Sequence, residues 1–274
     1  MAISASDVKK LKDLTSAGMM DCKKVLEESN GDFDKALKML KEKGLADAKK
    51  RSDRETKEGG VYVKSSGNKI ALCLLGCETD FVSRNEIFID NKEKILDKIL
   101  SSGSEDISSY EDIVQDITAK TKENVELKVA RFIELKAGET SAVYIHGNNR
   151  IGVVTVFETG SPDSKEFKEF ANNVSMHIAA TNPFYISDKD VPQNEIDEQK
   201  AIFTKQMDDS GKPANVIENI VKGKISKYFS EICLLDQGYV KDDKMTVKQF
   251  IETTAKALGT DIKVKNFIRY KIGA

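Results

Sequence analysis

Residues 61–75 read VYVKSSGNKIALCLL, which is an apolar run, a Ser-Ser-Gly-Asn turn and a longer apolar run. Residues 143–156 repeat the pattern as VYIHGNNRIGVVTV, and a Glu-Thr pair follows each copy at residues 78–79 and 158–159. Short apolar and β-branched runs joined by Gly-Asn turns are typical of β-hairpins. A tandem repeat of this length predicts that one structural unit occurs twice in the fold.

The repeat continues beyond the two hairpins. A helical pattern follows each one, from Glu86 to Leu100 and from Lys165 to Ala180, and a Thr-Ala-Lys sequence later leads into a last apolar strand. Each half therefore predicts the order β-β-α…α-β. We expect an α+β fold with two duplicated α+β subdomains, a core subdomain N at residues 59–140 and a core subdomain C at residues 141–274.

The second half is longer because it contains an insertion between about residues 187 and 244. Within it, residues 194–208 and 214–229 have the apolar spacing of helices, and Ser210-Gly211-Lys212-Pro213 is typical of a turn. This pattern predicts an antiparallel helical hairpin. Its many charged residues exclude a core element and leave two interpretations open, a solvent-exposed spur or a contact arm for a partner.

Three short helical patterns occupy residues 1–45. Asn30-Gly31 is expected to end the second helix, Asp32 to cap the third and Gly44 to end it. Three helices of this size predict one small N-terminal bundle. The apolar content then disappears, so residues 46–58 are expected to form a charged linker, for which a helical conformation stays open.

Composition restricts the partners that this chain can have. Its 274 residues include 43 Lys and Arg against 45 Asp and Glu, a net charge of −2, so it lacks the positive field that non-specific nucleic-acid binding requires. No segment reaches the roughly 20 apolar residues of a membrane span, and the first residues do not resemble a secretory signal. We expect a cytoplasmic protein that binds neither nucleic acid nor membranes.

Little in the sequence indicates catalytic chemistry. Phosphate-binding glycine motifs are absent, and the only histidines are His146 in a predicted turn and His177 on an apolar helix face. The four cysteines show neither disulfide nor zinc spacing and are expected to remain thiols: Cys22, Cys73, Cys77 and Cys233. We expect a binding protein with no catalytic residue, metal or cofactor, although a thiol enzyme that uses Cys22 or Cys73 is an alternative.

One stretch is difficult to explain by structure alone. Residues 77–85 read CETDFVSRN at the junction of a strand and a helix, whereas residues 157–162 of the second copy read FETGSP. In one interpretation Thr79 or Asp80 caps the helix and Phe81 belongs to the core. In the other, Asp80 and Phe81 form a projecting tip, with an acid beside an aromatic anchor of the kind found at interface hot spots.

Four segments together resemble a known family. They are KLKDLTSAGMMDCKK at residues 10–24, NGD at 30–32, ETDFVSRN at 78–85 and MHIAA at 176–180. They are similar to bacterial translation elongation factor Ts, and the similarity runs from about Val8 to Ile272. The resemblance implies a ubiquitin-associated-like helical domain, two related α+β subdomains and a protruding helical hairpin, in agreement with the elements expected from the residues.

The same resemblance implies a function without covalent chemistry, namely guanine-nucleotide exchange on elongation factor Tu in translation. It implies that four residues form the tip that enters a pocket of this GTPase near its magnesium site: Thr79, Asp80, Phe81 and Val82. A non-catalytic adaptor or chaperone-like binding protein is the alternative.

Two further groups are candidate contacts with the GTPase. The first group lies in the N-terminal bundle: Gly18, Met19, Met20 and Asp21. Met20 is expected to face outward as an adaptable contact, while Leu14 and Met19 continue the apolar stripes of their helices and are expected in the core. His146 is a possible partner contact, and His177 is assigned to structure.

Overall fold

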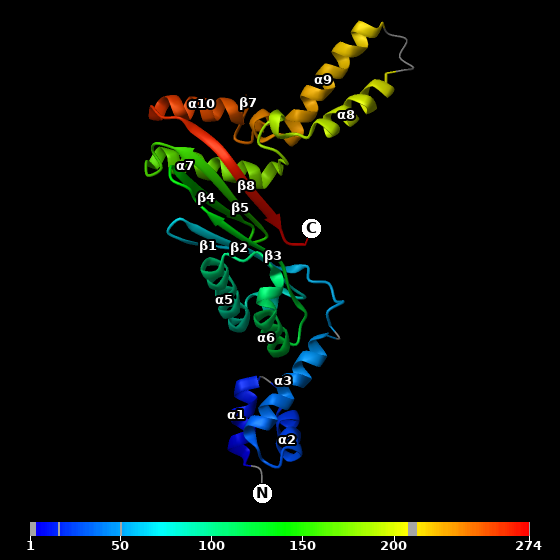
Figure 1. Ribbon diagram of the computed structural model, residues 1–274, viewed down its shortest axis with the longest axis vertical. Helices are drawn as coiled ribbons and strands as arrows, with labels where there is room; N and C mark the ends of the chain where they lie inside the picture. The colour runs from blue at the N-terminus through cyan, green and yellow to red at the C-terminus, as the bar shows by residue number, and fades with distance from the viewer. Residues whose placement is uncertain (1–3, 16, 50, 208–212, 274) are drawn as a thin grey trace. The chain divides into compact units, whose positions relative to one another are not determined.

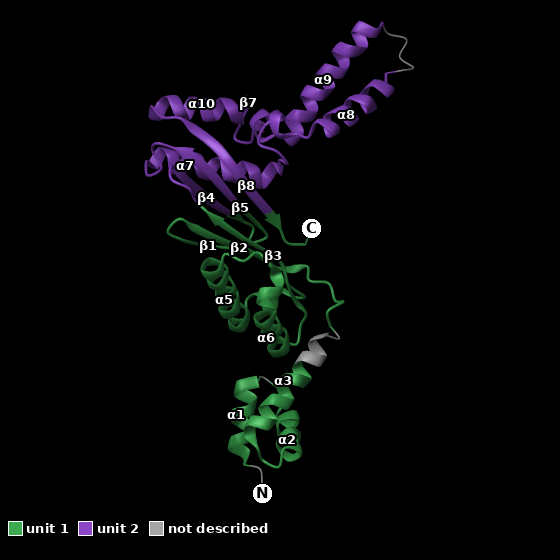
Figure 2. Cartoon of the chain, in the orientation of Figure 1, with its two compact units in different colours: residues 1–134, 145–152, 270–274 green, residues 135–144, 153–269 purple. Residues whose placement is uncertain are grey.

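The computed structural model describes residues 4–15, 17–49, 51–207 and 213–273. Contacts between residues divide the chain into two compact units, which Figure 2 distinguishes by colour. Unit 1 comprises residues 1–134, 145–152 and 270–274, and unit 2 comprises residues 135–144 and 153–269. Helices and small antiparallel sheets make both units α+β, as expected.

Three helices begin unit 1: α1 (Ala5–Thr15), α2 (Met19–Glu28) and α3 (Phe33–Lys49) (Figure 1). They surround a small apolar core that includes Leu11, Cys22 and Leu26. The backbone turns between α2 and α3 at Asn30 and Gly31, whose φ angles are 54° and 85°. The three helices and this turn are confirmed.

The predicted end of α3 is wrong. The helix continues through Gly44 to Lys49, so the first residues of the expected linker are helical. A Cβ atom at Gly44 would lie 3.3 Å from the Cβ of Ala119 in α6 (Glu111–Thr121). Gly44 therefore permits close approach of two helices and does not end one.

The expected burial of Leu14 and Met19 is also wrong, because their side chains are 58% and 54% exposed. Leu14 lies in the last turn of α1 and Met19 in the first turn of α2. Both have the correct angular position for the apolar stripe, but they lie at helix ends beyond the bundle core. Periodicity predicts the direction of a side chain and does not show where its packing partners end.

The first sheet has three antiparallel strands in the order β1-β2-β3. Their bounds are β1 (Glu58–Ser66), β2 (Lys69–Cys77) and β3 (Val125–Glu134). The predicted turn joins β1 to β2, since Ser66 pairs with Lys69. β2 is the central strand and is buried along almost its whole length, which explains its continuous apolar sequence.

Helices cover this sheet on one face, as Figure 1 shows for α5 and α6. The elements between β2 and β3 are α4 (Asp80–Ser83), α5 (Glu86–Ser102), the 3₁₀ helix η1 (Ile107–Tyr110) and α6. Phe88, Ile95 and Ile99 of α5 pack in one core with Cys73 and Leu75 of β2. This core supports the junction at which β2 ends.

The second sheet has the order β4-β5-β8, with β4 (Glu139–His146), β5 (Ile151–Thr159) and β8 (Ile262–Lys271). α7 (Lys165–Thr181) follows β5, and α10 (Val247–Leu258) precedes β8. Apart from the short helices of the first half and the elements inserted between α7 and α10, the order of strands and helices is the same in the two halves. The aromatic rings of Phe157, Phe167 and Phe170 pack edge to face or tilted, with centroids 5.6–6.0 Å apart.

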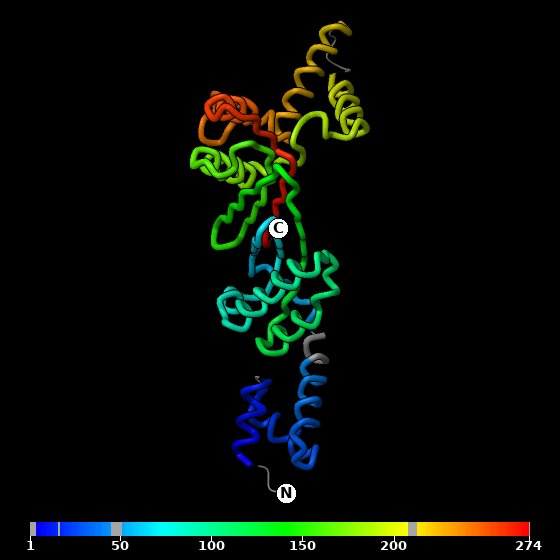
Figure 3. The backbone as a smooth tube through the Cα atoms, turned by 60° about the vertical axis from the view of Figure 1, so that its left-hand side comes forward, coloured from blue at the N-terminus to red at the C-terminus, as the bar shows by residue number. Residues whose placement is uncertain are grey.

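The insertion in the second half contains two helices that run side by side in both views (Figures 1 and 3). These helices are α8 (Gln193–Lys205) and α9 (Ala214–Ile232), so both helices predicted in the insertion are present. The expected turn residues 210–212 lie outside the described residues. Short elements flank the hairpin: the 3₁₀ helices η2 (Asp188–Asp190) and η4 (Leu234–Asp236), and the strands β6 (Gly238–Tyr239) and β7 (Asp242–Thr246).

Candidate functional site

The junction between β2 and α5 contains α4, a helix of only four residues. Val82 is buried in the core, with 8% of its surface exposed, whereas the neighbouring Phe81 is 82% exposed. Successive residues of a helix are rotated by about 100°, so a single turn directs one side chain inward and the next outward. The interpretation of Phe81 as a core residue is therefore wrong, and its ring projects into solvent.

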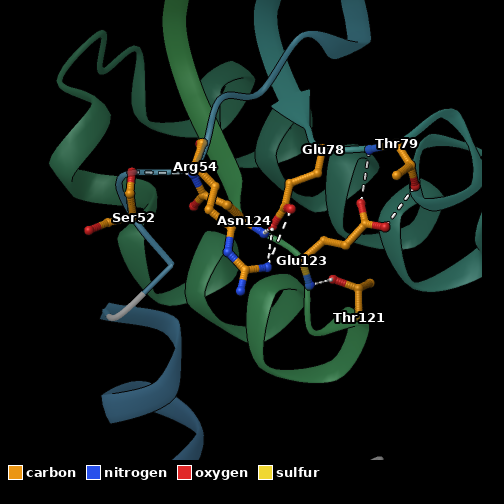
Figure 4. A network of polar contacts seen from close by, with 7 residues as sticks. All are labelled: Ser52, Arg54, Glu78, Thr79, Thr121, Glu123 and Asn124. Carbon is orange, nitrogen blue, oxygen red and sulfur yellow. Dashed lines mark hydrogen bonds and ion pairs between the residues drawn. The ribbon is translucent and has the colours of Figure 1, made fainter.

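Thr79 precedes this short helix and is held by a carboxylate from the α6–β3 connection (Figure 4). Its backbone N–H donates to Glu123 Oε2 over 3.0 Å, and its hydroxyl donates to Glu123 Oε1 over 2.7 Å. Thr79 occupies the N-cap position of α4, but its side chain makes no capping hydrogen bond with the helix. The predicted cap is correct in place and wrong in chemistry, because the hydroxyl binds Glu123 instead.

Glu78, the residue before Thr79, also bonds to the α6–β3 connection, but here the side chain lies at the end of β2 and the backbone belongs to the connection (Figure 4). Its carboxylate accepts a 2.6 Å hydrogen bond from the backbone N–H of Asn124 and lies 3.4 Å from the Arg54 guanidinium. The Asn124 side chain is buried and donates to the carbonyl oxygens of Ser52 and Arg54. The end of β2, the start of β3 and the segment before β1 are thus tied together at one point.

Asp80 lies at the start of α4, where a carboxylate interacts favourably with the helix dipole. Its Oδ2 atom is 3.0 Å from Nη2 of Arg84, and the side chains of Asp80 and Arg84 are 46% and 76% exposed. An exposed ion pair of this kind contributes only about 0–1 kcal/mol to stability. Asp80 is therefore available for contact with another molecule, and it lies directly beside the exposed Phe81.

The N-terminal candidates cluster at the connection between α1 and α2. Gly18 is the N-cap of α2, and Met20 is 77% exposed, as expected. Asp21 receives a 2.6 Å hydrogen bond from Lys43 Nζ, which lowers the pKa of its carboxyl. Together with the exposed Met19, these residues place flexible apolar side chains beside an ion pair on the surface.

The two histidines differ in environment. His177 is fully buried, its Nδ1 accepts from the backbone N–H of Val240 over 3.2 Å, and its Nε2 contacts Gln237 Oε1 at 2.9 Å. Burial lowers the pKa of His177, so the ring is neutral and structural, as predicted. His146 is exposed at the end of β4, and its predicted partner contact stays a prediction.

The cysteines offer little support for the thiol-enzyme alternative. Cys22 and Cys73 are fully buried, and burial raises the pKa of both thiols, to about 12 for Cys73. A thiol with such a raised pKa stays protonated at neutral pH and is a poor nucleophile. All four cysteines are free and buried, as expected for core residues.

The described parts of the chain contain neither a metal-binding cluster nor a membrane helix. No group of three or more His, Cys, Asp or Glu side chains within those parts is arranged to hold a metal ion. Nor does any helix in the same parts combine the length and the apolar character needed to cross a membrane.

Sequence reasoning missed three residues of this site, namely Glu123, Asn124 and Arg54. They lie far from the tip in sequence and have ordinary polar surroundings there. One available signal was the difference between the repeats: Glu-Thr follows the second strand in both copies, but Glu123 has no acidic counterpart among Leu258, Gly259 and Thr260. Comparing the two helix-to-strand connections would have drawn attention to it.

Comparisons with known proteins identify one family, through a family model that matches most of the chain and relatives that match almost all of it. Residues 78–274 match the family model described as Elongation factor TS. Elongation factor Ts of Borreliella burgdorferi is 40% identical over 276 residues, which cover 99% of each chain. Elongation factor Ts of Treponema denticola is 42% identical over 282 residues, which cover 100% of this chain and 99% of the relative.

Proposed function

The chain belongs to the elongation factor Ts family, and from this premise we propose that it is a guanine-nucleotide exchange factor for elongation factor Tu. It binds the GDP-bound and nucleotide-free forms of this GTPase and promotes GDP release during translation elongation. The observation that carries the proposal is the exposed Phe81 on a short helix fixed between Thr79 and the buried Val82. No covalent step, metal or cofactor of its own is required.

Phe81 is the proposed anchor of the exchange tip. Its ring enters an apolar pocket between helices of the GTPase, close to the magnesium site. Removing a Phe side chain from water contributes about 1.5–3 kcal/mol. Thr79 and Val82 hold α4 at both ends, so the tip loses little conformational freedom on binding. The burial of the Phe81 ring therefore contributes more of its free energy to the stability of the complex.

Asp80 is the proposed second element of the tip. GDP is held in a GTPase by backbone N–H groups, a lysine and Mg²⁺ together. A carboxylate inserted near these groups disturbs the polar contacts that support the metal. Exchange factor and nucleotide then weaken each other's binding by the same factor. A ten-thousandfold weakening requires roughly 5.5 kcal/mol of differential binding, which a few buried contacts can supply.

The N-terminal bundle is the proposed second contact with the same GTPase. Met19 and Met20 are exposed at the α1–α2 connection, and methionine adapts readily to an irregular partner surface. We assign Gly18 and Asp21 to the same contact and His146 to a smaller one. In this proposal residues 1–45 form a ubiquitin-associated-like domain, and the duplicated subdomains provide the tip and the frame that carries it.

We further propose that the protein acts in the cytoplasm and binds neither nucleic acid nor membranes. Its net charge of −2 supports the absence of non-specific nucleic-acid binding.

Release of fluorescent GDP from elongation factor Tu tests the proposal directly. The expected result is a release rate that rises with the concentration of this protein and then saturates. Binding without faster release would contradict exchange activity and favour the adaptor alternative. Measuring complex formation in the same samples separates these two outcomes.

A further inference from the structure

The antiparallel pairing of β2 with β3 is continued by side chains beyond its last backbone pair. Strand pairing ends with Cys77 opposite Val125, and the same register places Thr79 opposite Glu123 two positions farther on. There the Glu123 carboxylate accepts hydrogen bonds from both the N–H and the hydroxyl of Thr79. A side chain thus holds the backbone at the point where the strand leaves the sheet.

We propose that Glu123 is a positioning residue for Phe81, a role that rests on the proposed exchange function. Its carboxylate fixes the residue from which α4 starts and thereby the direction in which the Phe81 ring projects. Glu123 acts only through Thr79 and the backbone that follows it.

Contacts of the two neighbouring residues fix the position of Glu123 in the chain. α6 ends at Thr121, and its C-cap Lys122 turns the chain with a left-handed φ of 62° while its N–H donates to the Thr118 carbonyl in α6. Immediately afterwards the N–H of Asn124 donates to Glu78. Glu123 therefore lies between two fixed points, and its carboxylate is directed at Thr79 by the end of a helix and the start of a strand.

The helix α4 needs this support because it is too short to be stable alone. It has one turn, and no side chain caps its N-terminus. Helix formation is unfavourable until several turns exist, so external contacts must hold a single turn in place. Val82 in the core fixes the far side, and Glu123 fixes the near side through Thr79. Without Glu123, α4 is still anchored by Val82, but the Phe81 ring samples more directions.

Three variants test this inference. Glu123→Ala removes both acceptor oxygens, and Glu123→Gln keeps one of them. Glu126→Ala is the matched control, because Glu126 also accepts from a threonine hydroxyl, that of Thr56 at 2.9 Å, without contacting the tip. Each variant is compared with wild type in GDP release from elongation factor Tu, alone and combined with Phe81→Ala.

We expect Glu123→Ala to slow GDP release about tenfold at subsaturating concentration, the size typical of losing a charge-assisted hydrogen bond. Glu123→Gln should have a smaller effect and Glu126→Ala almost none. In the Phe81→Ala background the effect of Glu123→Ala should fall below about twofold, because coupled residues are not additive. These double variants are assayed at concentrations at which Phe81→Ala still accelerates release measurably.

Amide hydrogen exchange of the free protein gives a readout independent of the GTPase. In Glu123→Ala the Thr79 amide should exchange about tenfold faster, while amides in the centre of β2 keep their protection. Should Glu123→Ala fail to fold, Glu123→Gln carries the same tests.

Two results would overturn the positioning role. One is unchanged GDP release in Glu123→Ala while Phe81→Ala is impaired, and the other is an equal loss with and without Phe81. Failure of the wild-type protein to accelerate release would instead refute the proposed exchange function.

Discussion

The two strand-to-helix junctions of the repeat begin with the same Glu-Thr pair and then differ. In the first copy Asp80 and Phe81 follow on α4, where Phe81 is exposed and Asp80 is half-buried. In the second copy Gly160 follows, and its N–H donates to the hydroxyl of Thr260 over 3.1 Å. A Cβ atom at Gly160 would lie 2.8 Å from that hydroxyl oxygen, so a side chain at this position would require the Thr260 side chain to move.

This comparison separates the common framework from the specialised tip. Both junctions are held by a residue of the connection that leads into the third strand of the sheet. This residue is Glu123 between α6 and β3 in the first copy, and Thr260 between α10 and β8 in the second. The hydroxyl of Thr260 binds one backbone N–H, whereas the Glu123 carboxylate binds an N–H and a hydroxyl. The second copy therefore serves as an internal control for changes made in the first.

Among substitutions at the two junctions, Phe81→Ala should cause the largest loss of affinity and of GDP release. Truncating a buried interface anchor commonly costs about 2 kcal/mol or more, roughly a 30-fold loss in affinity and in GDP release at subsaturating concentration. Thermal unfolding of the free protein should stay unchanged, because the ring is 82% exposed. Stopped-flow GDP release and calorimetry check both statements. A strongly lowered melting temperature with unchanged release per folded molecule would show that Phe81 serves the fold.

Asp80→Ala should have a smaller effect on binding and a clear effect on release. Its ion pair with Arg84 is exposed and contributes little to stability, so the fold is preserved. We expect roughly tenfold slower GDP release at saturation with less loss of affinity, because the charge acts on the metal region after docking. Titrating the exchange factor separates the two parameters. Equal losses in affinity and in the saturated rate would contradict the assigned role.

His177→Asn tests whether the second copy's polar residues serve the fold. Burial lowers the pKa of His177 below its ordinary value of 6.5, so the unfolded state binds more protons below pH 6.5. The stabilisation is thus complete above pH 6.5 and decreases as the pH falls, by at most about 1.4 kcal/mol per pH unit. Denaturant unfolding between pH 7.5 and 5.5 should show this loss in wild type and in His146→Asn, but not in His177→Asn. In His177→Asn the exchange activity per folded molecule should not change.

The sequence was sufficient for the elements but not for the details of the site. Apolar periodicity predicted both hairpins, the helices that follow them and the helical insertion, because local patterns determine which residues can be buried. The residues alone left Phe81 either in the core or on a projecting tip, because local sequence does not show the contact that holds the preceding Thr79, made by Glu123 at a distance of 44 residues in the chain. For the same reason the position of Met19 was wrong: its helix was predicted correctly, but the edge of the core depends on neighbouring helices.

Thr260→Val should give the smallest effect and tests the comparison most sharply. The substitution keeps the size of the side chain and removes the oxygen that accepts from the Gly160 N–H. Loss of this one neutral hydrogen bond, at an exposed position where water can replace it, should cost about 0.5–1.5 kcal/mol of stability or less. GDP release should be unchanged, because the second junction projects no anchor. The matched substitution in the first copy is Thr79→Val, which removes one hydrogen bond to Glu123 and should slow release several-fold. If Thr260→Val slowed release as much as Thr79→Val did, the two hydroxyls would act in the same way in both copies. The activity of the tip would then not depend on the contact that holds its own junction.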